Sequence, residues 1–151
     1  MSNGRILWAA LFALVLAGGC IQGRIDQPDD YLPIATGPQY DQRFLSVEGN
    51  VIACRTVANP KGGTLDYWTK AVTKELTERA GYRLKSAETI TADGRDGTLF
   101  EFRTPVGGVE HTYLLAMFVD RSTIALVEAA GETEQVEKDR DRLLATIRSI
   151  H

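Results

Sequence analysis

Few side chains in this sequence have the types and spacing that catalysis requires. His111 is the only histidine inside a predicted element; Glu110 precedes it, and the adjacent predicted strand offers Glu101, Arg103 or Thr104. Nucleophilic catalysis needs a nucleophile, a base and an orienting group within hydrogen-bond reach of one another. The simpler interpretation is a half-exposed strand histidine near one end of a sheet. We therefore predict no catalytic residue and keep a dyad at His111 as the alternative.

Metal and phosphate chemistry has no better support. The chain has two histidines and two cysteines, and its acids lack the spacing of a zinc or calcium site. The acidic pairs at positions 29/30 and 139/141 fall in a predicted tether and on a solvated helix face, where raised pKa values are not expected. Gly107-Gly108 joins two strands and opens no helix, so it does not form a phosphate loop. The sequence predicts no metal site and no cofactor.

The first 20 residues are organised like an export signal. Arg5 gives a basic start, residues 6–17 form an apolar run without a charge, and Gly18-Gly19-Cys20 closes the run with small residues. A helix that spans a bilayer needs about 20 apolar residues, so this run fits the apolar region of a signal peptide instead. We predict that residues 1–19 are a signal peptide and exclude them from the fold.

Residues 16–20, with the sequence LAGGC, resemble the lipobox of bacterial lipoprotein precursors. The resemblance implies cleavage before Cys20, a diacylglyceryl group on its sulfur and an acylated amino group, with palmitate as a typical chain. Two or more acyl chains hold a small domain on a membrane, at about 0.8 kcal/mol per buried methylene. Because Ile21 and not aspartate follows Cys20, the resemblance also implies sorting to the outer membrane, facing the periplasm. The alternative is an ordinary secretory peptide that ends near a cysteine.

Charge and cysteine content narrow the classes of partner. Of 17 basic and 20 acidic residues only Arg5 lies in residues 1–19, so the formal net charge of −3 becomes about −4 in the mature chain. An acidic chain of this kind is not suited to binding nucleic acid. With Cys20 acylated, Cys54 has no partner within the chain, and its neighbours Val51 to Ala53 are apolar. We therefore predict a buried free thiol at Cys54 in preference to a reactive or metal-binding one.

Residues 20–40 contain three prolines and no sustained periodicity. This composition predicts a flexible tether behind the lipidated cysteine, which holds the domain a few nanometres from the bilayer. Tyr31, Leu32 and Ile34 offer an alternative, in which the segment docks on the domain. Both interpretations stay open.

Residues 109–130 predict the centre of the fold. Two strands in this stretch are apolar on both faces beyond Tyr113, and the polar residues 120–122 form the turn between them. A sheet that is apolar on both faces needs cover on both faces, and the other elements are expected to supply it.

The remaining pattern completes a single domain, residues 41–151. Glycine-rich and polar breaks separate a hairpin, a helix capped by Thr64 and Gly81, two further strands and a final helix after Gly131. The expected elements are Arg43–Val47, Val51–Ala58, residues 65–80, Tyr82–Thr91, Thr98–Thr104, the two central strands and residues 132–150. We expect Thr98–Thr104 nearer a sheet edge, and Trp68 in the core and not on a ligand platform. The fold class is α+β: a mainly antiparallel sheet of about six strands with one helix packed on each face, an α-β-α sandwich.

This order of elements, with Gly81-Tyr82 after the first helix and residues 127–131 (VEAAG) before the last, is similar to the PsbP-like domains and the DcrB-like lipoproteins of bacteria. The similarity covers roughly residues 41–151. It implies a compact α-β-α sandwich used as a binding or accessory module without a cofactor, and it transfers no functional residue.

Two classes of function follow. The favoured one is a membrane-anchored lipoprotein of the cell envelope that binds a protein partner without catalysis. A structural lipoprotein that contacts peptidoglycan belongs to the same class. The alternative is an envelope enzyme or small-ligand carrier with a pocket near His111. A concave pocket that holds His111 with an acid within hydrogen-bond reach would support the alternative. A closed sandwich without such a pocket would support the favoured function.

Overall fold

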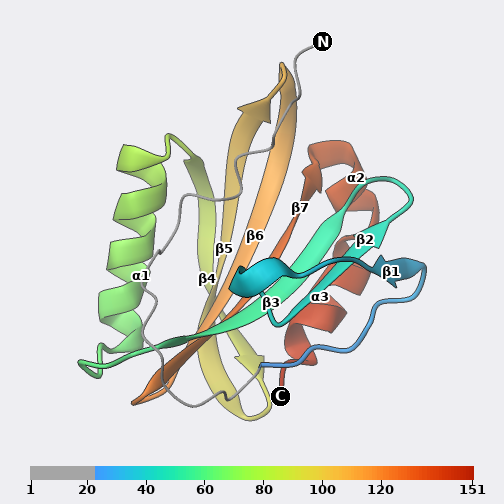
Figure 1. The fold of residues 1–151 in the computed structure, drawn as a ribbon. Coiled ribbons are helices and arrows are strands. Elements are labelled where there is room, and N and C mark those ends of the chain that lie inside the picture. Colours follow the sequence, from blue (N-terminus) through green and yellow to red (C-terminus); the bar gives the residue numbers. More distant parts are fainter. Residues whose placement is uncertain (1–22) are drawn as a thin grey trace.

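The computed structural model describes residues 23–151, so the predicted signal peptide and Cys20 lie outside the described residues. This part of the chain forms one seven-stranded sheet with helices on both faces (Figure 1). The strands are β1 (Tyr31–Pro33), β2 (Gln42–Ser46), β3 (Val51–Ala58), β4 (Arg83–Ala92), β5 (Arg95–Val106), β6 (Val109–Val119) and β7 (Thr123–Glu132). The helical segments are η1 (Gly37–Gln39), α1 (Leu65–Lys74), the π-helical turn η2 (Glu75–Arg79), α2 (Thr133–Lys138) and α3 (Arg140–Arg148). No helix in residues 23–151 is long and apolar enough to cross a membrane.

The strand order is β1-β2-β3-β7-β6-β5-β4, with every neighbouring pair antiparallel. β6 and β7 are flanked by paired strands on both sides, and their apolar residues face the core on both sides of the sheet. The α+β class and the central strand pair are therefore confirmed.

The seventh strand, β1, was not expected from the sequence. It is three residues long and ends in a proline, so it gives no alternation that a pattern search can detect. It forms because Tyr31 is buried and pairs with Ser46 of β2, while Leu32 beside it remains 70% exposed. The sequence left two interpretations of residues 20–40, a flexible tether or a segment docked on the domain. The described part of this segment, residues 23–40, is docked on the domain.

The prediction that β5 lies nearer a sheet edge than the central pair is confirmed, because β5 is next to the edge strand. β5 lies between β4 and β6, and β4 forms the edge. Glu101 and Arg103 gave the strand an edge-like pattern, but both side chains are largely buried in ion pairs. Charged residues can occupy an inner strand when they are paired in this way.

The two faces of the sheet are covered differently. On the α1 face, Val72 and Leu76 pack against Phe100, Phe102 and other apolar residues of the central strands. The opposite face, here called the α3 face, is covered by α2, α3 and the docked N-terminal segment, with Leu143 in its core. The prediction of one helix per face is therefore wrong for the α3 face.

Asp139 separates the two helices of the α3 face. Its backbone leaves helical geometry (φ −104°, ψ 8°), and its carboxylate accepts a hydrogen bond from the Tyr31 hydroxyl at 2.5 Å. Arg142 also pairs with this carboxylate at 3.3 Å. The break in the final helix thus lies where the helix is tied to β1.

Cys54 is a buried free thiol, as predicted. Its Sγ lies 3.1 Å from the carbonyl oxygen of Gly23. Burial, followed by the negative charge of Asp41, raises the pKa of the thiol to about 11. Cys54 is therefore neutral at physiological pH and unsuited to nucleophilic or redox chemistry.

Candidate functional site

His111 lies on β6 between Thr104 of β5 and Glu132 of β7. Its Nδ1 is 3.1 Å from the carbonyl oxygen of Val109, and no carboxylate among residues 23–151 hydrogen-bonds to its ring. Of the residues expected near it, Thr104 is its direct cross-strand partner, whereas Glu101 and Arg103 project from the other face of the sheet. The structure does not assemble a dyad here.

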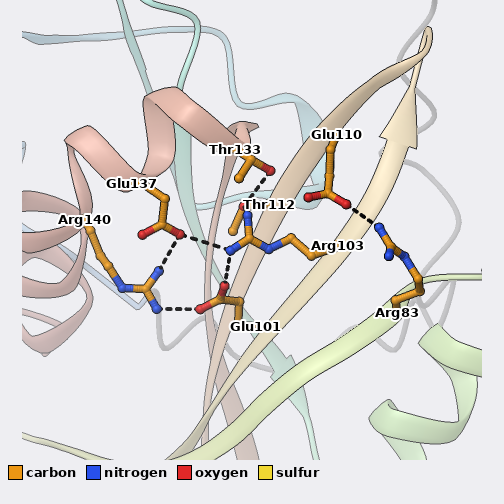
Figure 2. Close-up of polar contacts among 8 residues, drawn as sticks. All are labelled: Arg83, Glu101, Arg103, Glu110, Thr112, Thr133, Glu137 and Arg140. Carbon is orange, nitrogen blue, oxygen red and sulfur yellow. Dashed lines mark hydrogen bonds and ion pairs between the residues drawn. The ribbon is translucent and has the colours of Figure 1, made fainter.

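Glu101 and Arg103 instead form an ion-pair network with the helices of the α3 face (Figure 2). Arg103 contacts Glu101 at 2.6 Å and Glu137 at 3.1 Å, and it donates to the hydroxyl of Thr112 at 2.6 Å. Arg140 of α3 bridges Glu101 and Glu137. The network therefore joins β5 and β6 to α2 and α3.

The charge state of Glu101 follows from this network. Burial alone raises its pKa, but hydrogen bonds and charges from Arg140 and Arg103 outweigh burial and lower the pKa below the ordinary value of 4.5. Glu101 is therefore ionised and compensated at neutral pH. This is the property of a structural ion pair, since a general acid or base needs a pKa near the working pH.

A cavity of about 500 Å³ lies at the end of the sheet away from His111. It is on the α1 face, where the β3–α1 loop and the start of α1 stand over β6 and β7. Its lining is Val57, Ala58, Asn59, Pro60, Lys61, Gly63, Tyr67, Trp68, Val72, Met117, Ile124 and Leu126. Met117 is six residues from His111 along β6, which is about 20 Å in an extended strand. The cavity and His111 are therefore separate features.

Asn59 holds the mouth of the cavity in shape. Its Nδ2 donates to the carbonyl oxygens of Gly63 at 2.8 Å and Asp120 at 2.9 Å. Its Oδ1 accepts from the backbone N–H of Gly63 at 2.8 Å and from Nε1 of Trp68 at 3.2 Å. Because Asn59 is buried, these bonds satisfy its amide and tie the β3–α1 loop both to α1 and to the β6–β7 turn.

Trp68 packs directly against this loop. A Cβ atom on Gly63 would lie 2.5 Å from Nε1 of Trp68, so only glycine allows the approach. The ring of Tyr67 meets Trp68 edge-on, with centroids 5.2 Å apart, and Tyr67 is 59% exposed at the rim. The mouth thus combines an exposed aromatic residue with a half-buried one.

A buried charged pair lies next to the cavity on the same face. Arg55 Nε is 2.8 Å from Glu128 Oε1, and these residues lie two positions from the cavity residues Val57 and Leu126. Burial and the charge of Glu128 raise the pKa of Tyr40 to about 12 and hold the pKa of Tyr113 well above its ordinary value. Both phenols are therefore neutral, and neither is activated as a nucleophile.

Known structures share the fold of this chain, although no protein-family model and no curated protein sequence matches it. Cyanobacterial PsbP (CyanoP) from Synechocystis sp. PCC 6803 is similar with a TM-score of 0.63 and 15% identity, over 91% of this chain and 98% of that chain. LpqN of Mycobacterium tuberculosis, a protein involved in cell envelope biogenesis, has a TM-score of 0.69 and 10% identity, over 85% of this chain and 82% of that chain. A protein of unknown function from Pseudomonas aeruginosa has a TM-score of 0.62 and 11% identity, over 88% of this chain and 84% of that chain.

The fold is PsbP-like. At identities of this size the similarity establishes the architecture alone.

Within this PsbP-like fold the cavity is suited to binding. Its volume is in the range of about 300–1,000 Å³ that is usual for small-molecule sites, and apolar walls with a few polar groups at the mouth are typical of such sites. No residue in its lining is a cysteine, serine, histidine or acid. Lys61 and Tyr67 are the ionisable residues of the lining, and the rest of the wall supplies mainly apolar contact area.

Sequence patterns did not reveal this site. Asn59 to Gly63 look only like a break after a strand, and Trp68 lies on the apolar stripe of α1, as expected of a core residue. A signal was nevertheless present in the asparagine that begins the break and the glycine pair that ends it, because a buried asparagine and close-packed glycines often shape a loop. Cys20, the predicted lipidation site, lies outside the described residues.

Proposed function

We propose that this protein is a lipoprotein of the bacterial cell envelope that acts as a non-enzymatic binding module and holds an apolar group in the cavity beneath α1. The observation that carries the binding role is the cavity, about 500 Å³ in volume with apolar walls. Transfer of apolar surface out of water supplies the affinity, at about 25 cal/mol per Å².

The anchor and the location rest on the sequence. The LAGGC motif at residues 16–20 supports lipidation of Cys20, and Ile21 supports delivery to the outer membrane with the domain in the periplasm. LpqN, which shares the fold, is involved in cell envelope biogenesis, and this agrees with an envelope role.

The absence of catalysis is part of the proposal. It is supported by His111, which lies about 20 Å from the cavity and has no acid partner within residues 23–151. The alternative of an enzyme or carrier with a pocket near His111 has less support, because the cavity lies at the other end of β6.

Two measurements test the proposal. For the anchor, cells that express the full chain are labelled with palmitate; we expect label on the wild type and none on Cys20→Ala. Label that persists on Cys20→Ala excludes Cys20 as the lipidation site.

For the cavity, the purified full chain is titrated with the fluorescent apolar probe N-phenylnaphthylamine. Val57→Phe places a larger side chain in the cavity, and we expect it to weaken probe binding about fivefold or more. Val47→Phe makes the same change at a residue that is 93% exposed in the β2–β3 turn, at the opposite end of β3 from the cavity, and we expect it to leave binding unchanged. Equal affinity for both variants would move the binding site elsewhere.

A further inference from the structure

The docked part of the chain begins only three residues after the predicted lipidation site. The N–H of Gly23 donates to Thr56 Oγ1 at 2.8 Å, and that of Ile25 donates to Gln42 Oε1 at 2.8 Å. Between them, Arg24 and His151 exchange two backbone hydrogen bonds of 3.1 and 3.0 Å. Because a residue extends a chain by at most about 3.6 Å, Cys20 lies within about 11 Å of Gly23.

This attachment point lies at the same end of β3 as the cavity but on the opposite face of the sheet, since adjacent side chains of a strand point to opposite faces. Thr56, the partner of Gly23, is next in sequence to Val57, which lines the cavity. Among the described residues β2 pairs with β3 only as far as Cys54, so the last part of β3, from Arg55 to Ala58, has no β2 neighbour. The C-terminus, the β3–α1 loop and the β6–β7 turn lie at the same end of the sandwich (Figure 1).

The β3–α1 loop, the start of α1 and the β6–β7 turn form the rim of the cavity at this end. The rim carries positive charges that have no ion-pair partner in the described part of the chain. Lys61 and Arg121 are exposed and form no ion pair within residues 23–151, although the chain as a whole is acidic. The loop and the turn that carry them are in contact, because a Cβ on Gly62 would lie 3.7 Å from the carbonyl oxygen of Arg121. The acids nearest to them in sequence, Asp66 and Asp120, are paired with Lys70 and Arg95. The unpaired charge of this loop and this turn is therefore positive, while the neighbouring β4–β5 hairpin carries the exposed acids Asp93 and Asp96.

Aromatic and apolar groups complete the rim. Tyr67 is 59% exposed beside Trp68, and Pro60 is exposed on the loop. Tyrosine and tryptophan are enriched at membrane interfaces, and basic residues there meet anionic headgroups. One end of the sandwich thus has four features together: an anchor within about 11 Å of Gly23, unpaired cations, interfacial aromatic residues and an open apolar cavity.

We propose that this end of the sandwich rests on the bilayer and that the cavity takes up an acyl chain of a membrane phospholipid. Lys61 and Arg121 then lie at the level of the phosphates, and the cavity opens toward the acyl region. The proposal rests on the proposed function, since it requires the lipid on Cys20 to hold the domain at the surface. Attachment raises the effective concentration of bilayer lipid at the cavity mouth, so even weak affinity for one chain leads to occupancy.

Trp68 gives a direct test in the mature lipidated protein. Removal of residues 1–19 takes away Trp8, which leaves Trp68 as the only tryptophan. The protein is reconstituted into vesicles of phosphatidylethanolamine and phosphatidylglycerol whose acyl chains carry bromine, which quenches tryptophan at short range. Flotation of the vesicles reports the anchor, and quenching reports the orientation. We expect the protein to float and Trp68 fluorescence to fall roughly twofold.

Two variants separate docking from uptake of the chain. Lys61→Glu/Arg121→Glu reverses the charge of the rim and is expected to remove most of the quenching while flotation persists. Its matched control, Lys74→Glu/Lys85→Glu, makes the same charge change at exposed residues outside the rim and retains the quenching. Val57→Phe narrows the cavity and is expected to lower the quenching without affecting flotation.

The outcomes are distinguishable. Flotation without quenching, or quenching that the rim variant and its control retain equally, overturns the docked orientation and leaves the lipid anchor intact. Quenching that is absent at ordinary protein-to-lipid ratios and appears only when the protein is strongly diluted in lipid shows that a second copy covers the cavity, and this also overturns the proposal. Failure to float rejects the anchor and the docking together.

Discussion

The α3 face and the α1 face of the sheet differ in how completely other elements cover them. On the α3 face two helices and the docked N-terminal segment close over the strands, and Leu114, Phe118 and Leu143 are buried. On the α1 face a single helix stands beside the strands (Figure 1), and the end of the sheet under Trp68 is left with a cavity. One face is a complete core and the other an incomplete one.

The difference indicates that the α3 face contributes mainly to stability and the α1 face to binding. Apolar side chains on the α3 face contact neighbours on all sides, and the ion pairs of Glu101 add connections between its helices and the strands. Residues around the cavity have apolar surface that no other side chain contacts. Such residues contribute less to stability, and their uncovered surface is available to a ligand. The four predictions below test this division, from the largest expected effect to the smallest.

The largest effect is expected from a leucine truncation on the closed face. Leu114→Ala removes a fully buried side chain and should lower the free energy of unfolding by about 2–5 kcal/mol. Leu126→Ala removes the same atoms from the cavity wall, where fewer neighbours are lost, and should cost about 1–2 kcal/mol. Urea denaturation measures both values, and equal losses contradict the distinction between the faces.

The next effect is expected from Asn59, whose side-chain hydrogen bonds hold the loop at the mouth of the cavity. Asn59→Ala leaves the groups of Gly63, Asp120 and Trp68 without their partner and should cost about 2–3 kcal/mol. It should also shift the emission of Trp68 to longer wavelength and weaken probe binding.

Asn50→Ala provides the matched control for Asn59. Asn50 is equally buried, but its amide donates to Gln135 of α2 on the closed face. It should cost comparable stability and leave probe binding unchanged. If both variants weaken binding, Asn59 acts only through global stability.

A smaller effect is expected from the ion pairs of Glu101. Its pKa is lowered in the folded state, so the native state binds its proton less readily than the unfolded state does. The resulting stability is fully present above pH 4.5 and is lost as the pH falls below that value. Glu101→Gln should cost about 1–2 kcal/mol at pH 7 and flatten the acid limb of the stability curve, as followed by circular dichroism. An unchanged acid limb contradicts this role for Glu101.

The smallest effect is expected at His111. Within the described residues its ring makes one hydrogen bond, with the backbone of Val109, so His111→Ala should change stability by no more than about 0.5 kcal/mol and leave probe binding intact. Loss of probe binding in a folded His111→Ala protein shifts the functional site to the opposite end of β6.

Much of the architecture could be predicted because it depends on local pattern. Alternation of side chains along β3, β4, β6 and β7 indicates strands, and Thr64 and Gly81 bound the first helical segment because capping depends on a few adjacent residues. The buried state of Cys54 followed from its apolar neighbours. The errors concern β1 and the break at Asp139, which depend on partners 15 and 108 residues away.

The cavity could not be predicted for the same reason. Its wall brings Val57, Trp68, Met117 and Leu126 together from three strands and a helix, and no spacing in the chain shows that they leave a gap. Asn59 looks like a loop residue until the carbonyl of Asp120, 61 positions later, is placed beside it.

By itself, the sequence determined where most of the strands and the first helix form and that the sheet is apolar on both faces, because these properties depend on residues close together in the chain. It also carries the motif at Cys20, which is a property of local sequence alone. Only the tertiary structure decided which charges are buried as pairs and which face is incomplete. It placed the cavity at the same end of β3 as Gly23 and on the other face of the sheet, because a void forms where distant segments leave the space between them unfilled.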